Sequence, residues 1–493
     1  MSSNPLPEAR SHPEVLGGIM SMWWSTLATL VLGFITISVS ARALSEEHFG
    51  VYFLLLTIVY LLQVISSLGM RASAARSIAS TPDRHEQARI VGTVMAFWLL
   101  TTVAVSIAAI LAKPVLLLAF SSDLLASLFI YVPLVYCIQS CDLLLDSIMQ
   151  GFQLYRQMAL ARLVTSTLNL ALVVLFLPVL HLGIDGLILA LALAQVAVIA
   201  LRFRAIPVSK RPRWDRALLR RLIRFGLPLQ GNEMLTFVSQ RLDVLILGAM
   251  ASPAAVAYLG VATKIPQNFQ RLFGSLYAVY YPYMAGLFGR GEQAEAERSL
   301  NRFLRLATFV TAGSALATVL FQREIVRLVF SEKYLDSAPA LGLLMIVFTI
   351  SVASTILDYA LMAAGHSDYM PVISFANTGP SALANVILIP LRGFMGAVYA
   401  KGLANIVSNP VSVWALRRET IDVRVSAYLK PMAIMAVCLA GYYGLGWDSV
   451  LAKSAVLGVF VVLCTRFSVV TFDDISTFAG NMRITKHRPA YEE

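Results

Sequence analysis

Near its middle the sequence carries a long apolar run, IDGLILALALAQVAVIALRFR, at residues 184–204. Between Leu187 and Leu201 its only polar side chain is Gln195, and Arg202 ends the run. About 20 apolar residues are what an α-helix needs to cross the hydrocarbon core of a bilayer. Because lipid offers the backbone no hydrogen-bond partners, we expect this run to form a membrane-spanning helix.

Similar runs recur along the chain of 493 residues, of which 58% are hydrophobic and 14% charged, with a mean hydropathy of +0.73. Soluble domains carry about a quarter of charged residues, so this composition excludes a soluble enzyme, a disordered chain and a disulfide scaffold. Fourteen apolar spans are predicted, at 19–41, 51–70, 90–112, 124–149, 159–180, 184–204, 226–249, 255–286, 303–322, 338–363, 371–391, 394–416, 428–446 and 449–470.

Lysine and arginine define the expected orientation. Most of the 39 fall in one alternate set of the connecting loops, which places both chain termini in the cytoplasm. The segment before the first span contains Glu8, Arg10 and Glu14 and is not net basic, so we expect that span to stay rather than to be cleaved as a signal peptide. The net charge of +11 then reflects topology and attraction to anionic membrane lipids, and no nucleic-acid partner is expected.

The sequence on either side of the most basic loop shows two matching patterns. A G-x-x-x-Y pattern occurs at Gly151–Tyr155 and at Gly365–Tyr369, and a G-x-x-G pattern follows at Gly183–Gly186 and at Gly393–Gly396. Each half holds six predicted spans and so enters the membrane in the same sense, as in transporters built from parallel repeats. The alternative is a chance match between glycine-rich helix ends.

The expected fold is therefore an all-α integral membrane protein of about 14 helices, with two six-helix repeats and an appended helix pair. Its predicted parts are a cytoplasmic N-terminal segment (1–18), an N-lobe (19–204), a basic inter-lobe loop (205–225), a C-lobe (226–416), a helix pair (417–470) and a cytoplasmic tail (471–493).

Two cations are predicted at the same depth in adjacent spans. Arg241 lies nine residues from the outer end of the seventh span and Lys264 lies nine residues into the eighth. At a rise of about 1.5 Å per residue, both come to about 14 Å below the outer surface. Charges at such depth usually face a cavity or a partner, so we expect an anion site between them. The alternative is internal pairing, for which Asp243 lies about one turn from Lys264.

Further polar residues extend this candidate cavity. Arg271 and Gln267 share a helix face with Lys264, and the second span carries Gln63 and Arg71 at helical spacing. The alternative for Arg271 is an ion pair with Glu233 in the seventh span. For Arg71 the alternative is extension of its side chain into the cytoplasm.

Acidic residues within predicted spans are candidates for binding a coupling proton or sodium ion. They are Asp142 and Asp146 in the fourth span, Asp358 in the tenth, and Glu233 and Asp243 in the seventh. The equal alternative is that they anchor helices by hydrogen bonding. No phosphate-binding loop, zinc motif or catalytic constellation is found, so we expect no metal, no other cofactor and no enzymatic activity.

Several segments resemble the oligosaccharide (polysaccharide) flippases, whose superfamily also contains the multidrug-and-toxin exporters and the lipid II flippase. They are Ala43-Leu-Ser-Glu-Glu-His-Phe-Gly-Val-Tyr52, Gly69-Met-Arg71, Arg224-Phe-Gly-Leu-Pro228 and Arg241-Leu-Asp243-Val-Leu-Ile-Leu-Gly248 with the following Tyr258 and Lys264. The resemblance covers nearly the whole chain, but its motifs are diffuse and none is catalytic.

This resemblance implies two lobes in a V around a central cavity, lined by spans one, two, seven and eight. It also implies alternating access that moves undecaprenyl-pyrophosphate-linked sugar repeat units across a bacterial inner membrane, for exopolysaccharide or O-antigen export. The expected partners are that lipid-linked substrate, membrane lipids and the polysaccharide polymerase and export machinery, with the transporter itself a monomer. The alternatives are a drug/cation antiporter, a lipid II flippase and, from the enzyme class, a polysaccharide polymerase or ligase.

Overall fold

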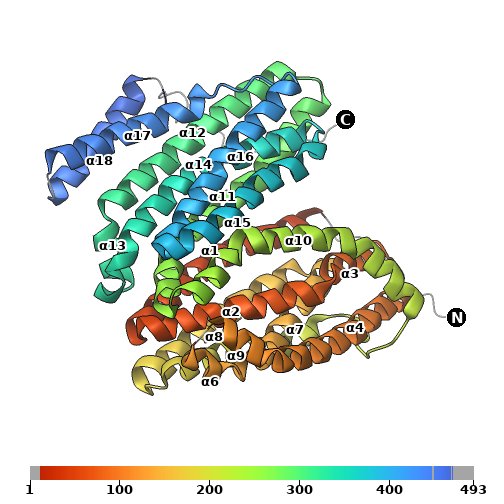
Figure 1. The fold of residues 1–493 in the computed structure, drawn as a ribbon. Helices are drawn as coiled ribbons and strands as arrows, with labels where there is room; N and C mark the ends of the chain where they lie inside the picture. The colour runs from red at the N-terminus through yellow and green to blue at the C-terminus, as the bar shows by residue number, and fades with distance from the viewer. Residues whose placement is uncertain (1–11, 121, 447–448, 468, 470–493) are drawn as a thin grey trace. The chain divides into compact units, whose positions relative to one another are not determined.

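The computed structural model describes residues 12–120, 122–446, 449–467 and 469. Within these ranges the backbone is almost wholly helical and contains no strand (Figure 1). The all-α fold class is therefore confirmed. The predicted terminal segments lie outside the described residues, except that residues 12–18 begin the first helix.

The first half of the chain forms α1 (His12–Ala43), α2 (Glu46–Ser67), α3 (Met70–Ala79), α4 (Arg84–Leu111), α5 (Lys113–Phe120), α6 (Asp123–Leu128), α7 (Tyr131–Gly151), α8 (Tyr155–Val174), the π-helical turn η1 (Leu175–Val179) and α9 (Gly183–Ala205). The second half forms α10 (Arg216–Met250), α11 (Pro253–Gly289), α12 (Gln293–Leu320), α13 (Gln322–Val329), η2 (Glu332–Ser337), α14 (Ala338–Ala363), η3 (Ser367–Tyr369), α15 (Met370–Arg392), α16 (Phe394–Arg418), α17 (Ser426–Leu445) and α18 (Val450–Arg466).

Ten of the described helical segments are long and apolar enough to cross a membrane. The other four predicted spans coincide with α10, α11, α16 and α18. The first three are long helices with a larger polar content, and α18 has only 17 residues. The chain is thus a multi-pass membrane protein, and the count of fourteen crossings stays a prediction.

Contacts divide the chain into two units. The first contains the residues up to Gly260 with Val329–Lys333 and Ile389–Phe394, and the second contains the remainder. The division falls inside α11, whereas the sequence suggested the loop 205–225 as the boundary. The physical reason is that α10 packs along α2 and α3, which ties it to the first unit.

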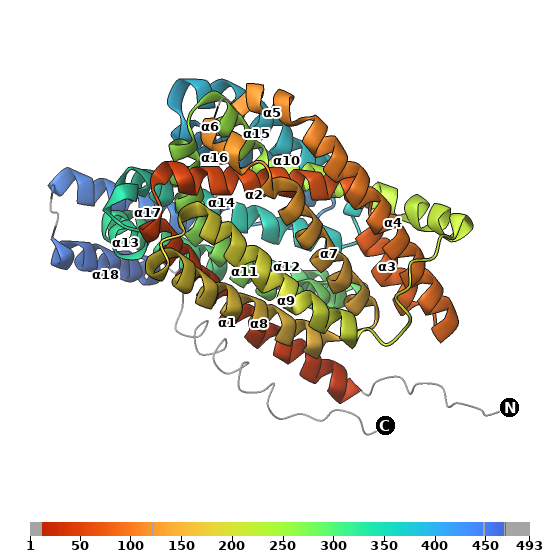
Figure 2. The ribbon, with the colours of Figure 1, turned by 90° about the horizontal axis from the view of Figure 1, so that it is seen from below.

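Within the first unit, α8 packs between α1 and α9, and Figure 2 shows these three helices as neighbours. A second layer of the same unit joins α3, α4, α7 and α10 around a fully apolar core that includes Ile78, Val91, Leu145 and Leu222. In the second unit α12 packs against α14 and α17, and α17 against α18. Each unit is thus a helical bundle with its own buried interior.

The repeated sequence patterns fall at corresponding helix junctions. Gly183 begins α9 and Gly393 directly precedes α16, with φ angles of 59° and 58°. Gly151 ends α7 shortly before α8, and Gly365 lies between α14 and α15. Glycine adopts such left-handed angles without strain, which explains Gly183, Gly365 and Gly393. Gly151 is helical, and a Cβ atom there would lie 2.9 Å from the carbonyl oxygen of Ala75, so close packing explains that glycine.

Candidate functional site

The first unit contains a helix break at the end of a candidate membrane span. α2 ends at Ser67, and Leu68 and Gly69 both adopt left-handed backbone angles, with φ of 42° and 68°, before the more polar helix α3 begins at Met70. The sequence predicted a span over 51–70, and the candidate span in the structure is Glu46–Ser67, so the prediction ran three residues past the break. The backbone groups that a break leaves free need polar partners.

Two glycines allow α10 to approach this break. A Cβ atom on Gly69 would lie 1.9 Å from the carbonyl oxygen of Gly226, and one on Gly226 would lie 2.7 Å from the carbonyl oxygen of Gly69. Neither position therefore tolerates a side chain. The contact brings the next two turns of α10, with Gln230 and Glu233, against the break.

Gln230 supplies hydrogen bonds that the interrupted helix lacks. Its buried Oε1 accepts from the backbone N–H of Gly69 at 2.9 Å and lies 2.6 Å from Ser67 Oγ, while its Nε2 donates to the carbonyl of Val64. A buried N–H without a partner costs about 1–3 kcal/mol, so Gln230 stabilises the break. Sequence reasoning missed this residue, although an amide four residues after the Gly226 position in an apolar span was a usable signal.

Arg71 forms an ion pair with Glu233 at the same place. Its Nη2 donates to both carboxylate oxygens at 2.9 Å, and the two side chains are 27% and 31% exposed. Arg71 is therefore one partner of Glu233, and the alternative pairing of Glu233 with Arg271 stays a prediction. Among the described residues nothing accepts from the buried Nε–H of Arg71, so the guanidinium keeps donor capacity for a further acceptor.

Arg71 and Gln63 line one small cavity of about 40 Å³ together with Ser67, Trp98 and Ser140. Gln63 donates from Nε2 to Gln139 Oε1 at 2.9 Å, and Trp98 donates from Nε1 to Ser140 Oγ at 3.1 Å. The cavity has room for water-sized groups but not for a sugar ring. Its exposed wall is mostly apolar, with Met70, Phe97 and Leu144 among the lining residues, and Arg71 supplies its positive charge.

Arg241 lies on the same ridge of α10 as Glu233, two turns further along, with Phe237 between them. Its side chain is half-buried, and no described residue of the first unit forms an ion pair with it. Asp243 is 2% exposed, and its Oδ1 accepts from the backbone N–H of Val244 at 2.9 Å. Its alternative pairing with Lys264 stays a prediction.

The remaining predicted cavity residues lie on α11 in the second unit. Lys264 and Gln267 are half-buried, and Arg271 is exposed one turn further along the same face. Arg241 and Lys264 thus belong to different units, and their convergence on one anion stays a prediction.

Asp142 and Asp146 are bound by arginines of two other helices. Arg202, which is 3% exposed, places Nε 3.2 Å from Asp142 Oδ1 and Nη1 2.8 Å from Asp146 Oδ1. Arg162 donates to the second oxygen of Asp146 at 2.9 Å. This cluster joins α7, α8 and α9, and sequence reasoning missed it because spacing within one helix does not show which helices are neighbours. The arrangement fits helix anchoring better than ion coupling.

Asp358 has a different environment in the second unit. Ser412 donates from Oγ to Asp358 Oδ1 at 2.7 Å, and no described residue forms an ion pair with this carboxylate. A neighbouring relay runs from the Tyr428 hydroxyl to Asn409 Oδ1 at 2.8 Å, and from Asn409 Nδ2 to Ser354 Oγ at 3.0 Å. The hydrogen-bond partner of Asp358 is thus a neutral hydroxyl, whereas Asp142 and Asp146 contact arginines. Within the described residues no group of three or more potential metal ligands is found.

A membrane-spanning bundle with a broken helix and charged residues along its spans is the architecture of a membrane transporter. The family described as "Polysaccharide biosynthesis protein" matches residues 15–288, more than half of the chain, and the protein belongs to this family. The resemblance read from the sequence is thereby confirmed.

One curated relative is the uncharacterized membrane protein MJ1068 of Methanocaldococcus jannaschii, 21% identical over 292 residues. That match covers 57% of this chain and spans 58% of the length of the relative. Among solved structures, the lipid II flippase MurJ in an inward closed conformation is 13% identical, with a TM-score of 0.73 over 92% of this chain and 100% of its own. An inward-facing multidrug resistance MATE transporter of the MOP superfamily is 16% identical, with a TM-score of 0.68 over 79% of this chain and 94% of its own. At these identities the structural likeness shows a shared fold.

Proposed function

We propose that the protein is a flippase that moves lipid-linked oligosaccharides across a bacterial inner membrane by alternating access. In this proposal the cargo is a sugar repeat unit on undecaprenyl pyrophosphate, for exopolysaccharide or O-antigen synthesis. Membership of the polysaccharide biosynthesis family and the fold shared with a lipid II flippase support this class of cargo.

The observation that carries the proposal is Arg71 beside the break between α2 and α3. A pyrophosphate must cross a region of low dielectric constant with its charge compensated. Arg71 is held in place by Glu233 through one nitrogen and has a buried Nε–H free to donate to a phosphate oxygen. Charge-assisted bonds of this kind are short and about twice as strong as neutral ones, so they suit an anionic headgroup.

Arg241 of the first unit and Lys264 of the second are kept as proposed anion-binding residues, as the sequence predicts. Both side chains are half-buried on the long helices α10 and α11. These two helices are more polar than the ten candidate membrane spans, as expected for helices that face an aqueous cavity. A drug/cation antiporter would carry a hydrophobic cation, which these arginine and lysine side chains would repel.

Coupling is proposed at Asp358. A carboxylate whose partner is a serine hydroxyl has capacity to bind a proton or a sodium ion, whereas Asp146 is neutralised by two arginines. If Asp358 binds the coupling ion, the Asp358→Asn variant should transport cargo equally fast with and without an imposed proton or sodium gradient. An unchanged response to both gradients would assign coupling elsewhere.

Polymer export in cells tests the function as a whole. Cells that lack their own flippase should export polymer when they express the wild-type protein and should fail with Arg241→Ala or Lys264→Ala at equal protein abundance. Arg220→Ala is a matched control, because it removes an exposed charge from the same helix α10. Normal export by both cavity variants would remove the proposed anion site.

A further inference from the structure

The second unit contains an open, mostly apolar groove that plays no part in the proposed cargo site. Its volume is about 870 Å³, and it is lined by parts of α14 and α16, by the linker after α16 and by the first turns of α17. Apolar lining residues include Ile350, Ile406, Val413, Trp414, Leu429 and Met432. At the end of α16, Arg417 and Arg418 complete the lining. We refer to this feature below as the α16 groove.

The α16 groove is about as long as one leaflet of a bilayer is deep. Ile406 precedes Arg418 by twelve residues on α16, which corresponds to about 18 Å at a rise of about 1.5 Å per residue. Half of a hydrocarbon core of about 30 Å is about 15 Å. The neighbouring wall comes from α17, which is itself a candidate membrane span. The groove therefore has the length to hold the acyl chains of a lipid.

Polar side chains in the wall of the groove are already bonded within the protein. The Tyr428 hydroxyl donates to Asn409 Oδ1 at 2.8 Å, and Asn409 Nδ2 donates to Ser354 Oγ at 3.0 Å. Tyr428 and Asn409 are buried, whereas Ile406 and Leu429 are 60% and 49% exposed. The groove thus offers an occupant apolar surface rather than hydrogen bonds, and apolar chains gain most from such a surface.

The two arginines at the end of the groove have no acidic partner in the described part of the chain. The adjacent carboxylate, Glu419, is engaged on another side: the Tyr369 hydroxyl donates to its Oε1 at 2.6 Å, and its Oε2 lies 3.5 Å from His366 Nδ1. Both arginine side chains are exposed. The apolar groove therefore ends in two positive charges that form no ion pair among the described residues.

Trp414 indicates the depth of this charged end. Its ring packs edge-to-face against Tyr369, with centroids 6.0 Å apart, and the Arg418 guanidinium lies 5.4 Å from its centroid. Tryptophan favours the interface between hydrocarbon and water, and a cation over its ring is attracted to it. The arginines are thus expected at the depth of lipid headgroups, and the orientation predicted from the basic loops puts them on the cytoplasmic side.

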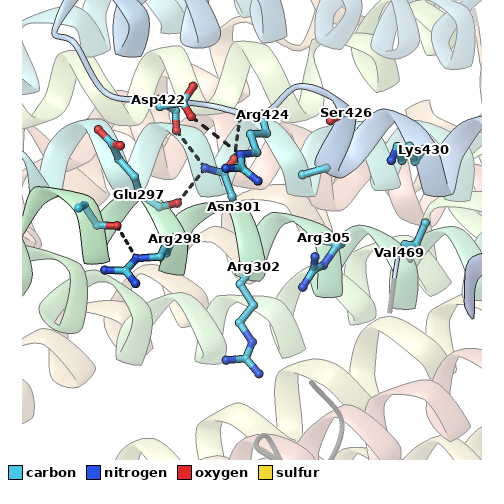
Figure 3. Close-up of a pocket in the computed structure, with 12 residues that line it drawn as sticks. Glu297, Arg298, Asn301, Arg302, Arg305, Asp422, Arg424, Ser426, Lys430 and Val469 are labelled. Atoms are coloured by element: carbon cyan, nitrogen blue, oxygen red, sulfur yellow. Dashed lines mark hydrogen bonds and ion pairs between the residues drawn. The ribbon is translucent and has the colours of Figure 1, made fainter. Parts of the chain in front are cut away.

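The linker that borders the groove is fixed by α12. Asn301 donates from Nδ2 to the carbonyl of Asp422 at 3.0 Å and accepts at Oδ1 from the backbone N–H of Arg424 at 2.7 Å (Figure 3). The next residue, Val425, lines the groove. This wall is therefore formed before a ligand binds, which lowers the entropic cost of binding.

We propose that the α16 groove binds an anionic glycerophospholipid of the cytoplasmic leaflet. The acyl chains lie along the apolar wall, and the phosphate lies beside Arg417 and Arg418. Charge-assisted bonds suit a phosphate, and each basic residue near the surface adds to the attraction for anionic lipids. An undecaprenyl chain fits less well, because it is much longer than one leaflet is deep. This site is independent of the cargo site and of the proposed function.

Lipid binding to the purified full-length protein tests the charged end. Native mass spectrometry would compare phosphatidylglycerol, zwitterionic phosphatidylcholine and undecaprenyl phosphate. We expect the wild type to retain phosphatidylglycerol preferentially and R417Q/R418Q to bind it roughly thirtyfold more weakly, because two cations near the surface are lost. The matched control is R220Q/R221Q, which removes two adjacent exposed arginines from α10 in the first unit and should bind like the wild type.

A second pair of variants tests the apolar part of the groove. L429W places a larger ring in the groove and should weaken binding of phosphatidylglycerol and phosphatidylcholine alike. L445W makes the same change further along α17, outside the groove, and should bind both lipids like the wild type. Leu429 and Leu445 are 49% and 63% exposed, so both variants should keep the wild-type melting temperature in detergent.

Several results would overturn the proposal. Wild-type binding of phosphatidylglycerol by R417Q/R418Q would show that the arginines do not hold the headgroup, and an equal loss in R220Q/R221Q would indicate general surface charge. Equal retention of both phospholipids by the wild type, or wild-type binding by L429W, would also contradict it. Preferential binding of undecaprenyl phosphate would assign the groove to a polyprenyl lipid instead.

Discussion

Arg71 donates from Nη2 to both carboxylate oxygens of Glu233, each at 2.9 Å, across the junction of a broken helix and its neighbour α10. The two residues are 162 positions apart in the sequence. This pair connects the architecture of the first unit with the proposed chemistry. Glu233 orients Arg71 just beyond the end of the α2 span, and Gln230 and Ser67 stabilise the helix break beside it.

The Arg71–Glu233 pair can be tested by a double-mutant cycle. Glu233→Gln removes the carboxylate charge but keeps a similar shape, and we expect it to lower the free energy of unfolding by about 1 kcal/mol. In the Glu233→Gln background no ion pair is left for Arg71→Gln to break. The double variant should therefore lose less stability than the sum of the losses in the two single variants. Denaturant unfolding in detergent measures this, and strictly additive losses would show that the pair contributes nothing.

The glycine contact gives a prediction with a close control. Gly69→Ala should destabilise the protein by at least about 3 kcal/mol, since the new methyl would overlap the carbonyl of Gly226. Gly183 has a similar φ angle, 59° against 68°, but no atom lies within 4 Å of a Cβ built there. Gly183→Ala should therefore lower the free energy of unfolding by only about 1 kcal/mol, because a residue with a side chain is strained in a left-handed backbone conformation. Equal yields of folded protein from both variants would contradict the close approach.

The arginine cluster of α7, α8 and α9 predicts a large loss of stability. Arg202→Gln leaves Asp142 without its arginine and Asp146 with one of two, so we expect a loss of about 3–5 kcal/mol. Arg204→Gln, two residues away on the same helix and exposed, should change the melting temperature little. A mild effect of Arg202→Gln on stability combined with a loss of gradient-driven transport would instead favour ion coupling at these acids.

A pH effect is expected at the start of α10, outside the membrane-spanning segments. The backbone N–H of Leu218 and the guanidinium of Arg89 donate to Asp215 and lower the pKa of its carboxyl. A lowered pKa in the folded state stabilises the protein above the unfolded value of about 4, and this stabilisation is lost as the pH falls through the folded value.

Asp215→Asn isolates that charge, because asparagine also caps helices well. The variant should be slightly less stable than the wild type at pH 7, and the difference should shrink as the pH falls below about 4. Thermal unfolding across this range measures the difference. A gap that persists at low pH would show that the carboxylate charge is not its cause.

The sequence predicted the helical architecture well because each span is long and apolar and because turn chemistry marks its ends. Gly183 and Gly393 identified two corresponding junctions without any structure. The break at Gly69 was missed because the residues before it continue the apolar pattern of a span. The presence of Gly69 in the sequence does not show that Gly226 of α10 packs against it.

Pairing of charges was harder to predict than their presence. Depth along the bilayer suggested Arg271 as a partner of Glu233, but did not indicate the pair that Glu233 forms with Arg71 through the contact between α10 and α3. Likewise, Arg202 belongs to the last turn of α9 and reaches back to Asp142. Both outcomes depend on which helices are neighbours, and periodicity within one helix carries no such information.

Transport of lipid-linked oligosaccharide in proteoliposomes tests the central claim most directly. The purified protein would be reconstituted with an oligosaccharide on undecaprenyl pyrophosphate, and a reagent that cannot cross the membrane would report how fast the sugar reaches the other leaflet. We predict fast transfer by the wild type and a loss of about a hundredfold or more in R241A/K264A, since each charge-assisted bond is worth about 1.5–3 kcal/mol. Transfer by a stably folded R241A/K264A variant at the wild-type rate would contradict the account.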